Sequence, residues 1–339
     1  MKALVTGASG FVGSHLAERL AAQGFEVFAL MRKTSQDRNL SAVPHRRIEG
    51  SLSDEASLRR AVEGMDFVFH VAGAIQASGR DAFFESNGEG TRRLVEATAA
   101  HSSGLRRFVY VSSLAAGGPG DGKQARDESH LDQPVSNYGE SKRQGELELL
   151  KFRDQLPVVI VRPPVVYGPR DRGMFVIART VSHGLMPLPP SGSPDRKKYY
   201  SVVHVADLVE GIILAATAPS DAFASGEVFY LSGDGVHHYE EMLQAMAEPL
   251  GVRPWKFGVP KIALVVAAHG LSWVSSLTGK KFALSRDKLN EILPDYWVCS
   301  NEKAKTKLGF LPRVSLKEGM RETIAWYREH GWLNAGGVR

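Results

Sequence analysis

Tyr138 and Lys142 stand four residues apart, separated by Gly139, Glu140 and Ser141. Residues at this spacing share one face of a helix. A free phenol titrates near pH ~10, too high for a base at neutral pH, but a neighbouring positive charge lowers its pKa. Alone, the spacing is typical of a solvated helix surface. Beside other reactive groups, it predicts a pair that exchanges a proton.

Two serines supply such groups. Ser112 and Ser113 end the apolar run 108–111, upstream of the Tyr–Lys pair. Hydride transfer needs an acid or base close to the oxygen whose charge changes, and a hydroxyl can hold that oxygen in line. The alternative is a serine that merely terminates a strand.

A glycine-rich turn opens the chain. Gly7, Gly10 and Gly13 lie between the apolar run 2–6 and a helical pattern over 11–23. Amides at a helix amino terminus attract anions, and glycines let a phosphate approach the main chain. The pattern Gly-x-x-Gly-x-x-Gly is weak alone, but between a strand and a helix it predicts a dinucleotide site that includes Phe11 and Val12.

The second apolar run, 26–31, is followed by two basic residues. A site that prefers NAD usually offers a carboxylate to the ribose there, whereas this chain has Arg32 and Lys33. A guanidinium binds a 2′-phosphate in a fork geometry. The sequence therefore favours NADP(H) over NAD(H), with a solvated strand end as the alternative reading of Arg32.

Strands and helices are expected to alternate along the chain. Predicted strands cover 2–6, 26–31, 46–49, 66–71, 108–112, 158–161 and 228–231, and predicted helices cover 11–23, 56–62, 90–100, 140–152, 206–216 and 240–250. This order indicates an α/β fold with a Rossmann-like, doubly wound parallel sheet. Prolines and glycines become dense over 163–194. We therefore place the dinucleotide-binding domain at 1–166 and a smaller C-terminal α/β substrate lobe mainly at 167–339, with segments returning to the first domain.

Composition narrows the functional classes. The 42 Lys and Arg exceed the 37 Asp and Glu by only five, and they are spread along the 339 residues, so nucleic acid is not an expected partner. The single cysteine, Cys299, fits a reducing compartment, and the residues after Met1 do not resemble a signal peptide; we expect a cytoplasmic protein. His237 and His238 have no further ligand at metal-binding spacing, so no metal is expected.

The stretch 259–277 is strongly apolar, but Lys261, His269 and Gly270 interrupt it, which argues against a membrane span. We favour an amphipathic helix that covers the substrate lobe. A membrane-surface anchor is the alternative.

These motifs together resemble the extended short-chain dehydrogenases/reductases of the NAD-dependent epimerase/dehydratase superfamily. The resemblance spans almost the whole chain. It rests on the turn 7–13, the Tyr138–Lys142 pair and the segment 162–169, which reads Arg-Pro-Pro-Val-Val-Tyr-Gly-Pro. The segments 69–73, 87–91 and 204–207 and the carboxyl end also agree with that family.

The resemblance implies a role for each residue. Tyr138 would be the general acid/base, Lys142 would lower its pKa and bind the nicotinamide ribose, and Ser113, with Ser112 as the alternate, would polarise the reacting group. Further cofactor contacts would come from Ser51 and Leu52 at the adenine, Val71, Ala72 and Gly73 along the phosphates, and Pro163, Pro164 and Val165 at the nicotinamide. Ser51 replaces the usual aspartate of the family. Related proteins also often form homodimers.

Three departures from the sugar-nucleotide enzymes narrow the reaction. Val165 stands where those enzymes commonly carry an asparagine, Tyr200 where they often carry an arginine, and Leu114-Ala115 where dehydratases have Asp-Glu. A valine cannot make the hydrogen bond of an asparagine. The segments 112–115 and 162–164 are closer to 3β-hydroxysteroid dehydrogenase, dihydroflavonol reductase and hopanoid-associated epimerase-like proteins.

We therefore predict an NADP(H)-dependent oxidoreductase that acts on an alcohol or ketone of a fairly apolar small molecule, polycyclic compounds included. One alternative is a sugar or sugar-nucleotide epimerase that works by transient oxidation. Another is a non-catalytic, dinucleotide-bound sensor or scaffold, because a fold does not dictate its chemistry.

Overall fold

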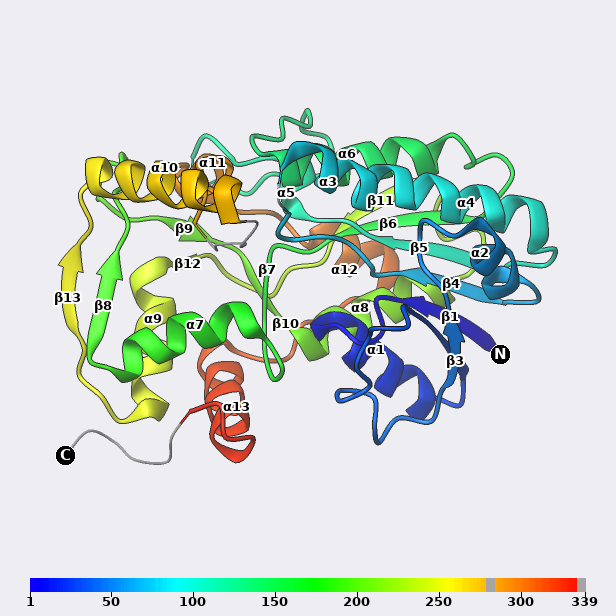
Figure 1. Cartoon of the computed structure of the whole chain (residues 1–339), viewed down its shortest axis with the longest axis horizontal. Coiled ribbons are helices and arrows are strands. Elements are labelled where there is room, and N and C mark those ends of the chain that lie inside the picture. The colour runs from blue at the N-terminus through cyan, green and yellow to red at the C-terminus, as the bar shows by residue number, and fades with distance from the viewer. Residues whose placement is uncertain (78, 123, 279–283, 334–339) are drawn as a thin grey trace.

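A seven-stranded sheet forms the centre of the computed structural model, which describes residues 1–77, 79–122, 124–278 and 284–333. Its strand order is β11-β6-β5-β4-β1-β2-β3, and every neighbouring pair is parallel (Figure 1). The strands are β1 (Lys2–Thr6), β2 (Glu26–Met31), β3 (Arg46–Glu49), β4 (Phe67–His70), β5 (Arg107–Val111), β6 (Val158–Arg162) and β11 (Glu227–Tyr230). The predicted parallel, doubly wound sheet is confirmed. Its order reverses between β1 and β4, where ligands bind such sheets.

Helices cover both faces of this sheet (Figure 1). One layer contains α1 (Phe11–Ala22), α8 (Val205–Thr217) and α12 (Glu302–Leu308), and the other contains α2 (Glu55–Val62), α4 (Gly90–His101) and α6 (Asn137–Leu150). Strand β5 shows how the sequence serves both layers: Val109 and Val111 belong to the core of the first, and Phe108 and Tyr110 to the core of the second. Strands buried on both sides read as continuous apolar runs, which made them recognisable.

The later part of the chain builds the substrate lobe but also returns to the sheet through β11 and α8. In the lobe, α7 (Arg172–Ser182), α9 (Tyr239–Leu250) and α13 (Leu316–Glu329) enclose a methionine-rich core. Short strands pair beside them: β7 (Val165–Tyr167) with β10 (Val202–His204), β8 (Leu185–Leu188) with β13 (Trp255–Gly258), and β9 (Tyr199–Tyr200) with both β12 (His237–His238) and β14 (Tyr296–Trp297).

The remaining helices are short or lie at the edge. They are α3 (Arg80–Phe83), the π-helical turn η1 (Phe84–Glu89), α5 (Leu114–Gly117), α10 (Lys261–Thr278) and α11 (Arg286–Ile292). The apolar stretch 259–277 thus forms α10, as expected. None of the helices within the described residues is long and apolar enough to cross a membrane.

The turn between β1 and α1 is held by close backbone contact. Gly7 has φ +71°, a conformation that favours glycine. A Cβ at Gly13 would lie 2.2 Å from the Gly7 carbonyl oxygen, so the first turn of α1 rests directly on the strand end. The backbone of Gly7 and Ala8 leaves the methyl group of an alanine no room.

We expect Gly13→Ala to lower the free energy of unfolding by ~2 kcal/mol or more, because overpacking against a fixed backbone cannot relax cheaply. Urea denaturation measures it. The matched control is Gly270→Ala on α10, where an added Cβ meets nothing within 4 Å; there stability should hold or rise by about 0.5–1 kcal/mol. An unchanged unfolding midpoint for Gly13→Ala would contradict the predicted clash.

Candidate active site

Ser113 and Tyr138 meet at the carboxyl end of β5. Ser113 is the N-cap of α5, where its hydroxyl accepts a hydrogen bond from the Ala115 amide at 3.1 Å. Tyr138 is the second residue of α6, and its side chain also hydrogen bonds with Ser113. Two residues that are 25 positions apart in the sequence are thus brought together with their oxygens adjacent. The structure therefore offers one hydroxyl pair at the point where the sequence predicted a reacting oxygen.

Ser112 points elsewhere. Its buried hydroxyl donates to Glu146 Oε1 at 2.6 Å. Glu146 also pairs with Arg162, whose Nη2 lies 2.5 Å from Glu146 Oε2, and Arg162 Nη1 lies 2.6 Å from Asp132 Oδ1. Of the two serines weighed from the sequence, Ser113 is the one beside Tyr138.

This buried cluster was not predicted from the sequence. Glu146 is completely buried, and Arg162 is 3% exposed. A charged residue that ends an apolar strand such as β6 was a signal that could have been followed, because a buried charge requires a partner. The partner Glu146 lies one helical turn after Lys142, on the same helix as Tyr138.

Burial controls the electrostatics of Tyr138 and Lys142. It raises the pKa of Tyr138 to about 12, although the hydrogen bond with Ser113 opposes the shift. It lowers the pKa of Lys142 to about 7. Lys142 was expected to lower the pKa of Tyr138, but it is not among the groups that shift that pKa. Its ammonium donates to the Val111 carbonyl at 2.7 Å and lies 4.3 Å from the centre of the Tyr110 ring.

The glycine turn lies at the same edge of the sheet as this hydroxyl pair. Gly10 is the exposed N-cap of α1, and no side chain in the described ranges caps that helix. Phe11 and Val12 are half-buried, so the amides of the first turn can receive an anion. A pyrophosphate fits this cradle by charge and by the room the glycines leave.

The loop after β4 joins the turn to Lys142. A Cβ at Gly7 would lie 2.8 Å from the Ala72 amide nitrogen, and one at Gly73 would lie 3.5 Å from Lys142 Nζ. The Ala72 amide also donates to Thr6 Oγ1 at 3.1 Å. Val71 is half-buried beside them. These predicted contact residues therefore line one path from the phosphate turn to the Tyr–Lys helix.

The remaining predicted cofactor residues lie along the same edge of the sheet. Arg32 and Lys33 are exposed after β2, and Ser51 and Leu52 are half-buried after the neighbouring β3. At the other end, the Leu114 amide donates to the Pro163 carbonyl at 2.8 Å, which ties the loop after β6 to the serine loop. Pro164 and Val165 follow, both half-buried.

The side chains around Tyr138 are mainly apolar and aromatic. Tyr138 and Tyr200 both pack against a buried cluster that includes Leu114 and Trp297. The Phe83 ring centre lies 6.1 Å from that of Tyr138. Tyr200, singled out as a replaced arginine, thus contributes an aromatic surface in this part of the molecule.

Helix α11 of the substrate lobe contacts the start of α6. Asp287 Oδ1 accepts a hydrogen bond from the Asn137 amide at 2.9 Å, and Glu291 Oε1 accepts one from Ser136 Oγ at 2.7 Å. Glu291 also contributes to the raised pKa of Tyr138. These contacts join residues about 150 positions apart, and the sequence offered no signal for them.

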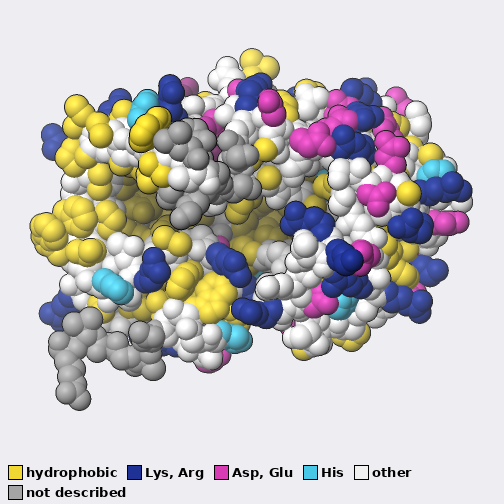
Figure 2. Space-filling view, viewed as in Figure 1, with side chains coloured by type: hydrophobic (Ala, Val, Ile, Leu, Met, Phe, Trp, Pro, Cys, Tyr) yellow, Lys and Arg dark blue, Asp and Glu magenta, His cyan; other side chains and the backbone are white. Residues whose placement is uncertain are grey.

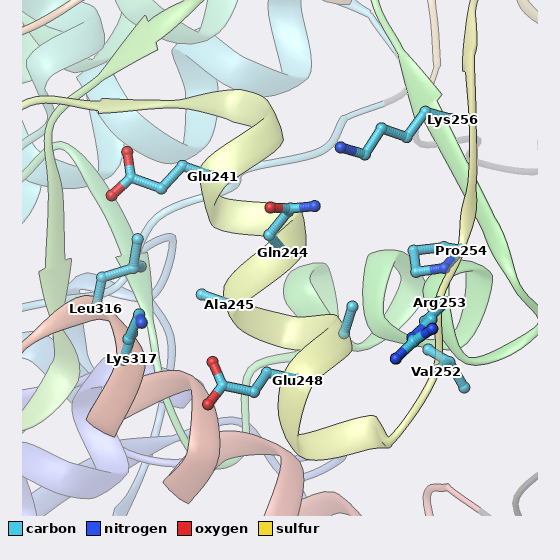
Figure 3. A pocket seen from close by; sticks show the side chains of 11 residues that line it. Glu241, Gln244, Ala245, Glu248, Val252, Arg253, Pro254, Lys256, Leu316 and Lys317 are labelled. Carbon is cyan, nitrogen blue, oxygen red and sulfur yellow. The ribbon is translucent and has the colours of Figure 1, made fainter.

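A cavity of about 500 Å³ lies elsewhere, in the substrate lobe between α9, β13 and α13 (Figure 3). Glu241, Glu248, Arg253 and Lys317 place charges of both signs around it, and the side chains of Glu248 and Arg253 lie on different segments (Figure 3). It includes none of the predicted site residues. The candidate active site is therefore the sheet edge, where the hydroxyl pair and the glycine turn lie.

Comparison with known proteins agrees with this architecture. The ceramide reductase of Caulobacter vibrioides is 29% identical over 97% of this chain and 95% of its own length. A putative dihydroflavonol 4-reductase of a Synechocystis strain is also 29% identical, with the same coverage. The N-acetyl-alpha-D-glucosaminyl-diphospho-ditrans,octacis-undecaprenol 4-epimerase of Escherichia coli O157:H7 is 25% identical over 96% of the chain and 95% of its own length.

Solved structures give the same result. The crystal structure of gox2253 has a TM-score of 0.80 and 28% identity, and the match covers 98% of this chain and 99% of the other. MoeE5 in complex with UDP-glucuronic acid and NAD has a TM-score of 0.76 and 26% identity, with 97% and 100% covered. Residues 3–230 match the model of the NAD dependent epimerase/dehydratase family. The chain belongs to that family of NAD-dependent reductases, epimerases and dehydratases.

Proposed function

We propose that this enzyme is an NADP(H)-dependent oxidoreductase that transfers hydride to or from an alcohol or ketone of a fairly apolar substrate. The observation that carries the proposal is the Ser113–Tyr138 pair at the carboxyl end of β5, on the sheet edge that also bears the glycine turn. In this proposal 1–166 bind the dinucleotide and 167–339 mainly form the substrate lobe. A cytoplasmic homodimer belongs to the same proposal.

The two hydroxyls would act on the substrate oxygen. When bound, the nicotinamide supplies or accepts the hydride. Ser113 would hold the oxygen, and Tyr138 would give it a proton during reduction or take one during oxidation. Because burial raises the phenol pKa to about 12, Tyr138 is protonated at neutral pH and ready to act as the acid.

The burial of Lys142 supports the proposal that α6 carries active-site residues. Its side chain is 3% exposed, and burial opposes its charge. A position that served only stability would favour an apolar side chain, since a buried ammonium costs free energy. Groups with strongly shifted pKa values gather at active sites. We infer that the charge is retained for the nicotinamide ribose and the nearby phenol.

The surroundings of Tyr138 support an apolar substrate. Phe83 lies beside it, and it packs against the same apolar cluster, including Leu114, as Tyr200 does. Val165 stands where a sugar-nucleotide enzyme would offer an asparagine. The relative named as a ceramide reductase supports an apolar, lipid-like substrate. The epimerase relative keeps epimerisation as the second candidate, and its name also includes a polyprenol. Lipid-like ketones are therefore the first substrates to test.

Arg32 and Lys33 support NADP(H). Both are exposed where β2 ends, and no described carboxylate forms an ion pair with either. A free guanidinium at this place can take the 2′-phosphate.

We expect Tyr138→Phe to lower turnover of a reducible ketone by ~100-fold or more while NADPH affinity is kept, because only the proton donor is lost. Stopped-flow absorbance of NADPH gives the rate, and fluorescence titration gives the affinity. Tyr296→Phe, which alters a tyrosine stacked on Tyr199, is the control.

Near-normal turnover of Tyr138→Phe would remove Tyr138 from the mechanism. Product formed without net NADPH consumption would favour the epimerase, and NADPH binding without hydride exchange across a broad ketone panel would favour the sensor.

Arg32→Ala should weaken NADPH binding by about tenfold or more and NADH binding much less, since only NADPH carries the 2′-phosphate. Isothermal titration with both cofactors measures the ratio. Arg46→Ala provides the comparison, because that exposed arginine pairs with Glu26 at the amino ends of β2 and β3, the opposite edge of the sheet from Arg32. Equal losses for the two cofactors would contradict a 2′-phosphate contact.

Lys142→Met should change how stability depends on pH. The pKa of Lys142 in the folded protein, about 7, lies below its ordinary value of 10.5. Between these values the unfolded chain binds more protons, so the contribution of Lys142 to stability rises with pH by up to about 1.4 kcal/mol per pH unit and is flat below pH ~7. The free energy of unfolding of wild type minus Lys142→Met, without cofactor, should follow this slope. A flat difference for Lys142→Met would refute the shift.

A further inference from the structure

Helix α10 exposes an apolar surface at the far end of the substrate lobe. Its exposed side chains include Ile262 at 75%, Val266 at 65% and Trp273 at 67%, and on the neighbouring β13 Trp255 is 68% exposed. Among the described side chains of α10 only Ala268 is buried. Figure 2 shows hydrophobic side chains gathered at the end of the molecule formed by α10, β8 and β13. We call Trp255, Ile262, Val266 and Trp273 the α10 surface.

The chain segment that contains the α10 surface has charged residues of one sign. The sequence contains no Asp or Glu from position 249 to position 286. The same segment carries Arg253, Lys256, Lys261 and Arg286 in the described part of the chain, and Lys280 and Lys281 outside it. Lys256 pairs with Glu240 of α9. Among the carboxylates of the adjoining α9 and α11, Glu240, Asp287 and Glu291 are each held by a hydrogen bond or an ion pair. An apolar helix face whose own segment carries only basic charges matches a negatively charged interface.

We propose that the α10 surface docks on anionic lipid bilayers, with α10 lying in the plane of the interface and not crossing it. The helix is 18 residues long, carries tryptophan, isoleucine and valine, and fails the requirements of a span. A second copy of the chain is a poorer occupant. Two such faces brought together would oppose their basic residues without any carboxylate from the same segment.

The α10 surface is linked to the candidate active site. Helix α10 packs on α11, and the Arg286 amide donates to Ser272 Oγ at 2.9 Å. The next residue, Asp287, accepts the hydrogen bond from Asn137 beside Tyr138. A bilayer bound here would lie one helix away from α6. This positions the enzyme to take a lipid-like substrate from the membrane, a point that rests on the proposed function, whereas membrane docking itself does not.

Vesicle sedimentation tests the docking without substrate. Phosphatidylcholine vesicles containing about 30% phosphatidylglycerol should bind the full chain at least about tenfold more tightly than phosphatidylcholine alone, and added salt should weaken binding. The double variant Ile262→Asp/Val266→Asp should lose at least about tenfold in partition coefficient. The control Leu131→Asp/Leu311→Asp changes two leucines that are 81% and 65% exposed elsewhere and should leave binding unchanged.

Tryptophan fluorescence provides the second measurement. Brominated lipids should quench the wild-type emission, and Trp273→Phe should remove a large part of that quenching while binding persists. Circular dichroism of each variant checks the fold.

Lack of binding at low salt, or equal binding of the Ile262→Asp/Val266→Asp variant, would overturn the proposal. Sedimentation equilibrium that showed self-association through the same surface and no vesicle binding would assign it to a second copy. Reduction of a detergent-dispersed ketone is assayed separately, so failure of docking and failure of the proposed reaction remain distinguishable.

Discussion

The buried ion pair between Arg162 and Glu146 fixes the helix that carries the acid/base candidate. Glu146 lies completely buried on α6, and Arg162 ends β6. An unpaired charge at either place would cost about 3–5 kcal/mol, so neither residue can move without the other. The same carboxylate receives the Ser112 hydroxyl. Helix α6 is thereby held against the ends of β5 and β6, and Tyr138, two turns upstream, is placed over the serine loop.

A second constraint sets the other side of the crevice. The first turn of α1 can rest on the end of β1 only because Gly13 lacks a Cβ, and the loop after β4 also approaches Gly7 closely. Both contacts are between backbone atoms, so they are insensitive to the packing of side chains. Together with the ion pair they fix the positions of α1, the loop after β4 and α6 at the carboxyl edge of the sheet.

The sheet and the glycine turn could be predicted because their signals are local. Strands such as β5, covered by helices on both faces, must be apolar throughout, and a turn such as 7–13 needs its glycines at fixed spacing. The other parts depend on contacts between distant segments. Asp287 and Glu291 reach α6 across about 150 residues. The pKa values of Tyr138 and Lys142 depend mainly on burial, which neighbours in sequence do not determine. The expectation from the Tyr138–Lys142 spacing alone, that the ammonium lowers the phenol pKa, therefore missed burial, which raises that pKa.

The contacts of α11 give the substrate lobe a direct influence on the position of Tyr138. Ser136 is the N-cap of α6: its hydroxyl accepts from the Gly139 amide at 3.0 Å and donates to Glu291. One hydroxyl thus connects the first turn of the helix that carries Tyr138 to a carboxylate of the substrate lobe. A capping interaction contributes about 1 kcal/mol to its helix, so a shift of α11 changes the geometry of that turn at low cost. The sheet supplies a fixed frame, through Arg162 and Gly13, while the last alignment of the phenol depends on a lobe whose outer helix presents its apolar side chains to the surroundings. Helix α11 thus contacts the first turn of α6 through Ser136 and the Asn137 amide, and these contacts do not pass through the sheet.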